Sequence, residues 1–305
     1  MFRRLLLSLL LACGPAAVYA DVAFESAHVA VVDELTGEVL LEKDAAAPAP
    51  IASMTKLLTA MVVVDANLDP DEPIRIAPED MDTLKHTHSG VPAGAVVPRG
   101  TLLELALIAS DNHAAAALAR TYPGGMDAFL AAARAKIASL GLTSTDIDEP
   151  TGLSPNNHST ALDMAKVLQA AAGYPAIADI TSKRAHAVQV NGRRWAVRNT
   201  NGLVGKPGWE ILASKTGFTN EAGRCLTMRL RTAGRTVLVV LMGAAASSER
   251  ALDALNIRRW LAGEQPLTVA AATPPRRVKS RHARAARAAR ARPTLQAAAR
   301  SDTDG

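Results

Sequence analysis

Three short motifs carry the residue types needed for acyl transfer to a serine. They are Ser53-Met54-Thr55-Lys56, Ser110-Asp111-Asn112 and Lys215-Thr216-Gly217, in that order along the 305-residue chain. A serine hydroxyl is a poor nucleophile until a neighbouring base takes its proton. An amine can be that base only if burial or another cation lowers its pKa toward neutrality. The first motif therefore predicts a serine nucleophile with a lysine base, and Lys215 is a candidate for the second cation.

The first motif requires a helix that brings its hydroxyl and its amine together. We predict a helix over Ser53–Leu68, because apolar side chains recur at the spacing of a buried helical stripe, at Met54, Leu57, Leu58, Met61 and Val62. On this helix Ser53 and Lys56 lie one turn apart on the same face. A serine at a helix N-terminus also has its own N–H unpaired, where it can face a developing oxyanion.

Taken singly, each motif has an ordinary structural explanation. Ser53 could be a helix N-cap, Lys56 an exposed helical lysine, and Lys215-Thr216-Gly217 the end of a strand. The pattern of a serine two residues before an asparagine also recurs at Ser154-Pro155-Asn156, so order alone does not select the middle motif. Ser110, however, stands between two amphipathic helical segments, whereas Ser154 lies in a Pro/Asn loop. All three motifs together, on suitable elements, favour catalysis.

The remaining pattern predicts an α+β domain with one antiparallel sheet and an inserted helical lobe. A β-hairpin is predicted over residues 27–43, and residues 69–100 look irregular because they are rich in Pro, Asp and Gly. Further helices are expected at 101–109, 112–121, 126–140, 160–172 and 248–261. Further strands are expected from residue 187, with a turn at Asn191-Gly192, and at 213–219, 224–231 and 236–243.

The charge is distributed unevenly along the chain. The net charge is +5, but residues 274–300 hold nine of the 34 Lys and Arg residues and no Asp or Glu. Residues 21–270 hold 23 basic and 27 acidic side chains, a net charge of −4. We therefore expect a disordered Arg/Ala-rich tail at 266–305 that could meet an anionic surface, and no role for nucleic acid in the function.

The first twenty residues have the pattern of a secretory signal. Arg3 and Arg4 precede an apolar run, and Val18-Tyr19-Ala20 suits a cleavage site. The run is too short to span a bilayer, so we expect a periplasmic protein with a catalytic domain over residues 21–265. The alternative is lipidation at Cys13, which follows a lipobox-like Leu10-Leu11-Ala12.

Cysteine and histidine are two further residue types that can carry chemistry. Cys225 lies in a strand pattern and is expected to be a buried side chain rather than a reactive thiol. His86 and His88 could be metal ligands, but no acidic or Cys partner stands at a supporting spacing, so we expect a polar loop and no metal. No Gly-rich loop that would hold a cofactor phosphate is present, and no cofactor is expected.

Over roughly residues 26–261 the chain resembles the low-molecular-mass penicillin-binding proteins of the D-Ala-D-Ala carboxypeptidase and endopeptidase family. The resemblance implies a β-lactamase/transpeptidase-like fold with a five-stranded antiparallel sheet. It makes Ser53 the acylated nucleophile, Lys56 its base, and Ser110 with Lys215 a proton relay toward the leaving amine. By the same resemblance Asn112 holds the substrate amide, Thr216 a carboxylate, and the N–H groups of Ser53 and Phe218, which follows Gly217, form the oxyanion hole.

The implied substrates are peptidoglycan peptides, and β-lactams are the implied acylating inhibitors. Only about 40 residues follow Leu261, and the run Lys215–Gly223 looks like the endopeptidase branch, which cuts D-Ala to diaminopimelate cross-links. A D-Ala-D-Ala carboxypeptidase is the nearest alternative. A β-lactamase is disfavoured because Glu149-Pro150 continues into a peptidase-like Thr151-Gly152-Leu153. A non-catalytic wall-binding protein is disfavoured by the intact motifs.

Overall fold

The computed structural model describes residues 22–267 of the chain. The predicted signal peptide, Cys13 and nearly all of the predicted basic tail lie outside these residues. Among residues 22–267, no helix has both the length and the apolar character needed to cross a bilayer.

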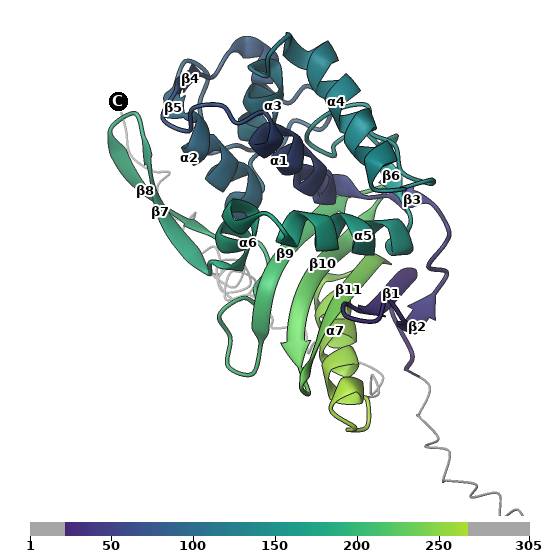
Figure 1. Ribbon diagram of the computed structural model, residues 1–305. Helices are drawn as coiled ribbons and strands as arrows, with labels where there is room; N and C mark the ends of the chain where they lie inside the picture. The colour runs from purple at the N-terminus through teal and green to yellow at the C-terminus, as the bar shows by residue number, and fades with distance from the viewer. Residues whose placement is uncertain (1–21, 268–305) are drawn as a thin grey trace, which may run out of the picture. The chain divides into compact units, whose positions relative to one another are not determined.

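A five-stranded antiparallel sheet forms the centre of the described chain (Figure 1). Its strands are β1 (His28–Asp33), β2 (Val39–Lys43), β9 (Glu210–Thr219), β10 (Gly223–Thr232) and β11 (Arg235–Ala244). They stand in the order β2-β1-β11-β10-β9, so the first hairpin pairs with the last strand of the sequence. The predicted sheet completed by both ends of the domain is confirmed, and β9 is left at one edge.

The central strand β11 is apolar on both faces because helices cover both sides of the sheet. Val237, Val239 and Leu241 join one buried cluster with Ala254 and Ile257 of α7 (Ser247–Leu261). The alternate residues Leu238, Val240 and Met242 join the other cluster, which contains the buried face of α5 (Ala161–Ala172). Successive side chains of a strand point to opposite faces, so one apolar run serves both layers.

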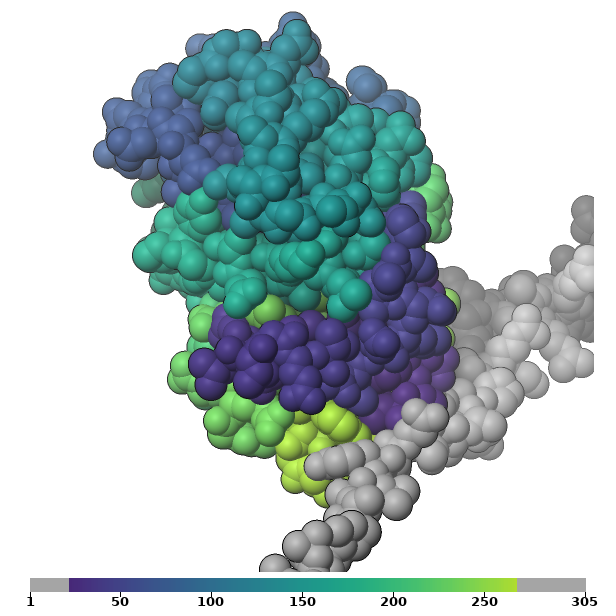
Figure 2. Space-filling view, turned by 45° about the vertical axis from the view of Figure 1, so that its right-hand side comes forward, coloured from purple at the N-terminus to yellow at the C-terminus, as the bar shows by residue number. Residues whose placement is uncertain are grey.

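The helical lobe lies between β2 and β9 in the sequence (Figure 1). Its helices are α1 (Lys56–Asp65), α2 (Arg99–Glu104), α3 (Asn112–Arg120), α4 (Gly125–Ser139), α5 and α6 (Pro175–Ser182). Short two-stranded sheets join β3 (Ala49–Pro50) to β6 (His158–Ser159), β4 (Pro73–Arg75) to β5 (Val96–Pro98), and β7 (Ala185–Val190) to β8 (Arg193–Arg198). Figure 2 shows the N-terminal hairpin directly beside the teal helical segments.

Three local predictions need correction. The helix predicted from Ser53 begins at Lys56, because Ala52–Thr55 form a 3₁₀ turn, η1. Residues 69–100 are not wholly irregular, since they contain β4, β5 and the short 3₁₀ turn η2 (Pro78–Asp80). The helix α6 was not predicted, because it is only two turns long and so offers little periodicity.

Candidate active site

The structure brings the three motifs to one place, between the first helix of the lobe and the edge strand β9. The first motif occupies η1 and the start of α1, and the second lies at the break before α3. The third lies within β9. Lys56 Nζ is 2.9 Å from Ser53 Oγ, and Lys215 Nζ is 2.8 Å from Ser110 Oγ. Each predicted lysine thus has its predicted hydroxyl within hydrogen-bond distance.

Lys56 is held by three acceptors in an almost closed environment. Besides Ser53 Oγ, its Nζ lies 2.7 Å from Asn112 Oδ1 and 2.6 Å from the Thr151 carbonyl oxygen. The residue is 1% exposed, and burial lowers its pKa to about 8. The charges of three carboxylates oppose this shift, those of Glu149, Asp111 and Asp82. About one tenth of the Lys56 amines are therefore neutral at pH 7.

Lys215 is equally buried, at 1% exposed. Burial first, and then the charges of Lys56 and Arg250, hold its pKa well below the usual range. The sequence made Lys215 a candidate for the cation that lowers the pKa of Lys56. Instead the charge of Lys56 lowers the pKa of Lys215, and burial lowers the pKa of Lys56. Like charges this close are unfavourable in a buried site, so the two amines do not readily carry protons together.

The backbone around the two serines is unusual. Ala52, just before Ser53, has a φ of 46°, and Ser110 has a φ of 61°. Non-glycine residues adopt this left-handed region rarely, and it is found preferentially at functional sites. The segment before Ser110, Leu105–Ala109, is π-helical, which is a second local irregularity. At these irregular points of the backbone, both hydroxyls lie within hydrogen-bond distance of a lysine amine.

Gly217 allows β9 to approach closely the turn that contains Ser53. A Cβ at this position would lie 2.9 Å from Ile51 O, 3.0 Å from Ala52 Cβ and 3.2 Å from Ser53 N. No side chain fits at the first of these distances without a shift of the backbone. The glycine of the third motif is therefore explained by the close approach of two backbones, at the point where the oxyanion hole is predicted.

The loop before β5 contributes residues that the sequence analysis missed. Asn112 Nδ2 donates to Thr87 Oγ1 at 2.7 Å, and Thr87 Oγ1 donates to Asp82 Oδ2 at 2.6 Å. Lys85 of the same loop forms an ion pair with Glu221, which follows β9. The only sequence signal here was the polar composition of residues 69–100, which identifies a loop and not its contacts.

Glu149 organises a loop at the site and is fully engaged there. Its carboxylate accepts the N–H groups of residues 151–154 at 2.5–3.3 Å, the Thr151 hydroxyl at 2.5 Å and Asn157 Nδ2 at 3.1 Å. This arrangement points the Thr151 carbonyl at Lys56. Both oxygens of the carboxylate are thus occupied by donors from its own loop. Its geometry is that of a structural residue and not of a base that activates water.

The other residues of the third motif line the outer part of the site. Thr216 Oγ1 donates to Thr200 Oγ1 at 2.6 Å, so Thr200 is a second hydroxyl that the sequence analysis did not identify. The Phe218 side chain is 46% exposed, and the Arg224 guanidinium lies 3.5 Å from the centre of its ring. Cys225 is buried as predicted, and burial raises the pKa of its thiol to about 11.

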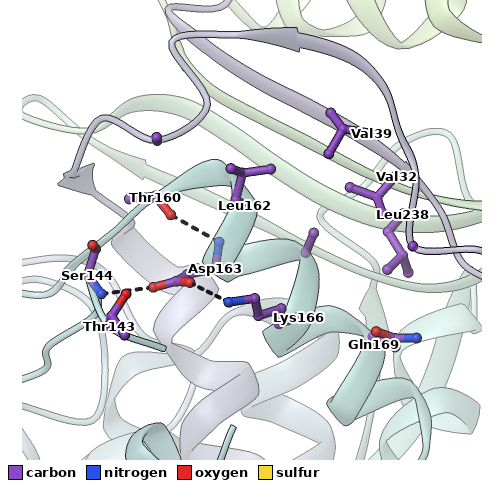
Figure 3. A pocket seen from close by; sticks show the side chains of 13 residues that line it. Val32, Val39, Thr143, Ser144, Thr160, Leu162, Asp163, Lys166, Gln169 and Leu238 are labelled. Carbon is purple, nitrogen blue, oxygen red and sulfur yellow. Dashed lines mark hydrogen bonds and ion pairs between the residues drawn. The ribbon is translucent and has the colours of Figure 1, made fainter. Parts of the chain in front are cut away.

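A pocket of about 490 Å³ lies away from the motifs, between the first hairpin and α5 (Figure 3). Its polar groups satisfy one another: Asp163 accepts Ser144 N and Thr145 Oγ1 and pairs with Lys166. None of the predicted site residues lines this pocket. His86 and His88 are exposed in the loop before β5, and residues 22–267 hold no cluster of three potential metal ligands.

Comparison with known proteins places the chain in a family. A sequence profile described as D-alanyl-D-alanine carboxypeptidase, peptidase family S11, matches residues 16–246. The D-alanyl-D-alanine endopeptidase of Pseudomonas aeruginosa is 41% identical over 249 residues, which cover 81% of this chain and 80% of that protein. The Escherichia coli D-alanyl-D-alanine endopeptidase is 39% identical with the same coverage.

A solved structure shares the fold. The Streptomyces K15 DD-transpeptidase superposes with a TM-score of 0.73 at 24% identity, covering 79% of this chain and 98% of that one. The predicted β-lactamase/transpeptidase-like architecture is thereby confirmed. The profile match spans most of the chain, so the protein belongs to the D-alanyl-D-alanine carboxypeptidase family of penicillin-binding serine peptidases.

Proposed function

We propose that this chain is a serine DD-endopeptidase that hydrolyses D-Ala to diaminopimelate cross-links in peptidoglycan through an acyl-enzyme on Ser53. The observation that carries the proposal is the contact between Ser53 Oγ and the buried Lys56 Nζ at 2.9 Å. This pair has the geometry of a nucleophile and its general base.

In the acylation step, the Ser53 oxygen attacks the carbonyl carbon of the D-Ala residue and its proton passes to Lys56 Nζ. A neutral amine has two N–H donors and one lone pair. The donors match Asn112 Oδ1 and the Thr151 carbonyl, which leaves the lone pair for the Ser53 hydroxyl. The oxyanion that develops would face the N–H groups of Ser53 and Phe218, where Gly217 lets the two backbones approach.

The second amine completes the proton balance. When the C–N bond breaks, the leaving amine takes a proton from the Ser110 hydroxyl, and Lys215 replaces it across their 2.8 Å contact. In deacylation, water attacks the ester carbonyl, its proton restores the Ser110–Lys215 pair, and Lys56 returns its proton to Ser53. Thr216 and Thr200 supply hydroxyls for a substrate carboxylate. No cofactor enters either step.

The two endopeptidases support this branch of the family, since each shares about two fifths of its residues with this chain over 80% of its length. A D-Ala-D-Ala carboxypeptidase is the second candidate, because the profile that matches residues 16–246 carries that description. Rapid hydrolysis of β-lactams is disfavoured, because the Glu149 carboxylate is already saturated with donors. We expect penicillin to acylate Ser53 and to remain attached.

The test uses two substrates and one variant. The mature protein should convert cross-linked muropeptide dimers to monomers and should release little free D-Ala from monomeric pentapeptides. Fluorescent penicillin should label the wild-type protein and not Ser53→Ala. If dimers survive while a control endopeptidase cuts them, the endopeptidase assignment fails. Release of D-Ala from pentapeptides would then favour the carboxypeptidase.

We further propose that the protein acts in the periplasm, where peptidoglycan cross-links are exposed. Residues 1–20 supply the support, as two arginines followed by a short apolar run. A periplasmic protein whose chain begins at Asp21 would agree with this proposal. Acylation at Cys13 would instead indicate a lipoprotein.

A further inference from the structure

We propose that Thr87 is a positioning residue that sets the orientation of the Asn112 side-chain amide, and through it the orientation of the Lys56 amine. This inference rests on the proposed function, in which Lys56 activates Ser53. Thr87 belongs to the loop between η2 and β5, about 25 residues before Asn112 in the sequence. None of the three motifs includes it.

The chain of contacts begins at Asp82, which holds the loop. Its Oδ1 accepts the N–H groups of Leu84 and Lys85 at 2.8 and 3.0 Å. Its Oδ2 accepts both the N–H and the hydroxyl of Thr87, at 2.7 and 2.6 Å. Partial burial works against ionisation of Asp82, but the hydrogen bonds from Thr87 and the loop N–H groups prevail and keep its pKa at about 2. At neutral pH this carboxylate only accepts hydrogen bonds.

Because Asp82 can only accept, the donor and the acceptor of each next hydrogen bond are fixed. The single hydroxyl proton of Thr87 is given to Asp82, so toward Asn112 the Thr87 oxygen can only accept. It accepts from Asn112 Nδ2 at 2.7 Å, which places Asn112 Oδ1 on the opposite side, 2.7 Å from Lys56 Nζ. If the Asn112 amide were flipped, its Nδ2 would face the N–H groups of Lys56 and its Oδ1 would face Thr87 Oγ1. Neither pair could then form a hydrogen bond, because one would join two donors and the other two acceptors.

This orientation matters for both roles proposed for Asn112. Its oxygen fixes one N–H of Lys56, so that the lone pair of the neutral amine is directed at Ser53 Oγ. Its second N–H is left for a substrate carbonyl. The loop that carries Thr87 is also held to the turn between β9 and β10, because Lys85 forms an ion pair with Glu221.

The experiment measures the second-order rate of Ser53 acylation by fluorescent penicillin in the full-length protein. Thr87→Val keeps the shape of the side chain but removes the hydroxyl, and we expect it to slow acylation about tenfold. Thr87→Ser restores the hydroxyl and should return the rate to within about threefold of wild type. Thr83→Val is the matched control, since Thr83 is an exposed threonine of the same loop and should change the rate less than about twofold.

A double-mutant cycle separates positioning from general damage to the loop. In an Asn112→Ala background, Thr87→Val should have no further effect, because the group that it positions is gone. Equal rates for Thr87→Val and Thr83→Val would overturn the proposal, and so would a full tenfold loss in the Asn112→Ala background. If the wild-type protein is not labelled at all, the proposed function itself fails, which is a distinct outcome.

Discussion

Lys56 has three acceptors around its amine, an arrangement that suits an ammonium, yet the reaction requires the neutral form. Burial resolves this conflict by lowering the pKa of Lys56 to about 8. The protonated form is then favoured only about tenfold at pH 7, and losing one proton frees the lone pair that faces Ser53. The contacts with Asn112 Oδ1 and the Thr151 carbonyl thus bind the ammonium and also orient the lone pair of the neutral amine toward Ser53.

The first prediction is a rise of the acylation rate with pH. Because the pKa of Lys56 lies below its ordinary value, the fraction of active, neutral amine increases as the pH passes through about 8. The rate of Ser53 labelling by fluorescent penicillin should therefore climb from pH 6 through about 8, and it should fall at higher pH, where Lys215 no longer holds the proton that it supplies through Ser110 to the leaving amine. The profile reports the coupled pair of Lys56 and Lys215.

Lys56→Arg provides the control for this profile. A guanidinium stays protonated throughout the range, so labelling should be lost at every pH. A wild-type rate that does not change between pH 6 and pH 10 would contradict the assignment of Lys56 as the base.

Residue type and spacing predicted which motif residues lie together, but not the groups that contact them. Ser53 lies beside Lys56, and Ser110 beside Lys215, as the short motifs predicted. Thr87 contacts Asn112, and the Thr151 carbonyl contacts Lys56, although both threonines lie far from these partners in the sequence. The contact of Thr151 is made by its backbone carbonyl, which any residue type supplies. Their contacts arise only when loops pack against α1 and α3.

At the scale of elements, the site depends on how closely β9 approaches η1. The sequence predicted β9, α1 and α3 within a few residues, because their apolar patterns are long. The short β4–β5 pair and α6 could not be predicted, because patterns of three to eight residues offer little periodicity, and the 3₁₀ turn at Ser53 packs against β9, which lies more than 150 residues later in the sequence. Gly217 of the third motif therefore permits the short distance between β9 and η1, because it has no side chain.

Gly217→Ala tests that spacing. The added Cβ would meet Ile51 O at 2.9 Å and must push β9 away from the nucleophile turn. Since the oxyanion hole is proposed between these backbones, acylation should fall by about 100-fold or more, as when an oxyanion donor is lost. The melting temperature should fall by only about 2–8 °C, because the damage is local. Stopped-flow or gel-based penicillin labelling measures the rate.

Gly202→Ala is the matched control, since a Cβ there meets no atom within 4 Å and its φ is not left-handed. Its acylation rate should stay within about twofold of wild type. If both alanine variants label at the same rate, the approach of β9 to η1 does not limit the reaction.

At the scale of the whole domain, residues from its two ends are joined at one buried carboxylate. Asp253 of α7 accepts the N–H groups of Glu25 and Ser26 at 3.0 and 2.8 Å, and the Ser26 hydroxyl at 2.6 Å. It is 1% exposed. These contacts span more than 220 residues and fix the segment that enters β1 against the helix that covers the same sheet. No local pattern in the sequence predicts them.

Asp253→Ala should therefore destabilise the domain without changing its chemistry. Three donors would lose their acceptor, two of them in a buried position, so the free energy of unfolding should fall by about 2–4 kcal/mol. Asp179→Ala is the control, because Asp179 of α6 forms an exposed ion pair with Lys183, which follows this helix, and its loss should cost at most about 0.5 kcal/mol. Urea unfolding measures both values. The acylation rate per folded molecule should be that of wild type in both variants, since Asp253 touches no residue of the three motifs. An Asp253→Ala protein that is as stable as wild type would show that the two ends of the domain are held together by the sheet alone.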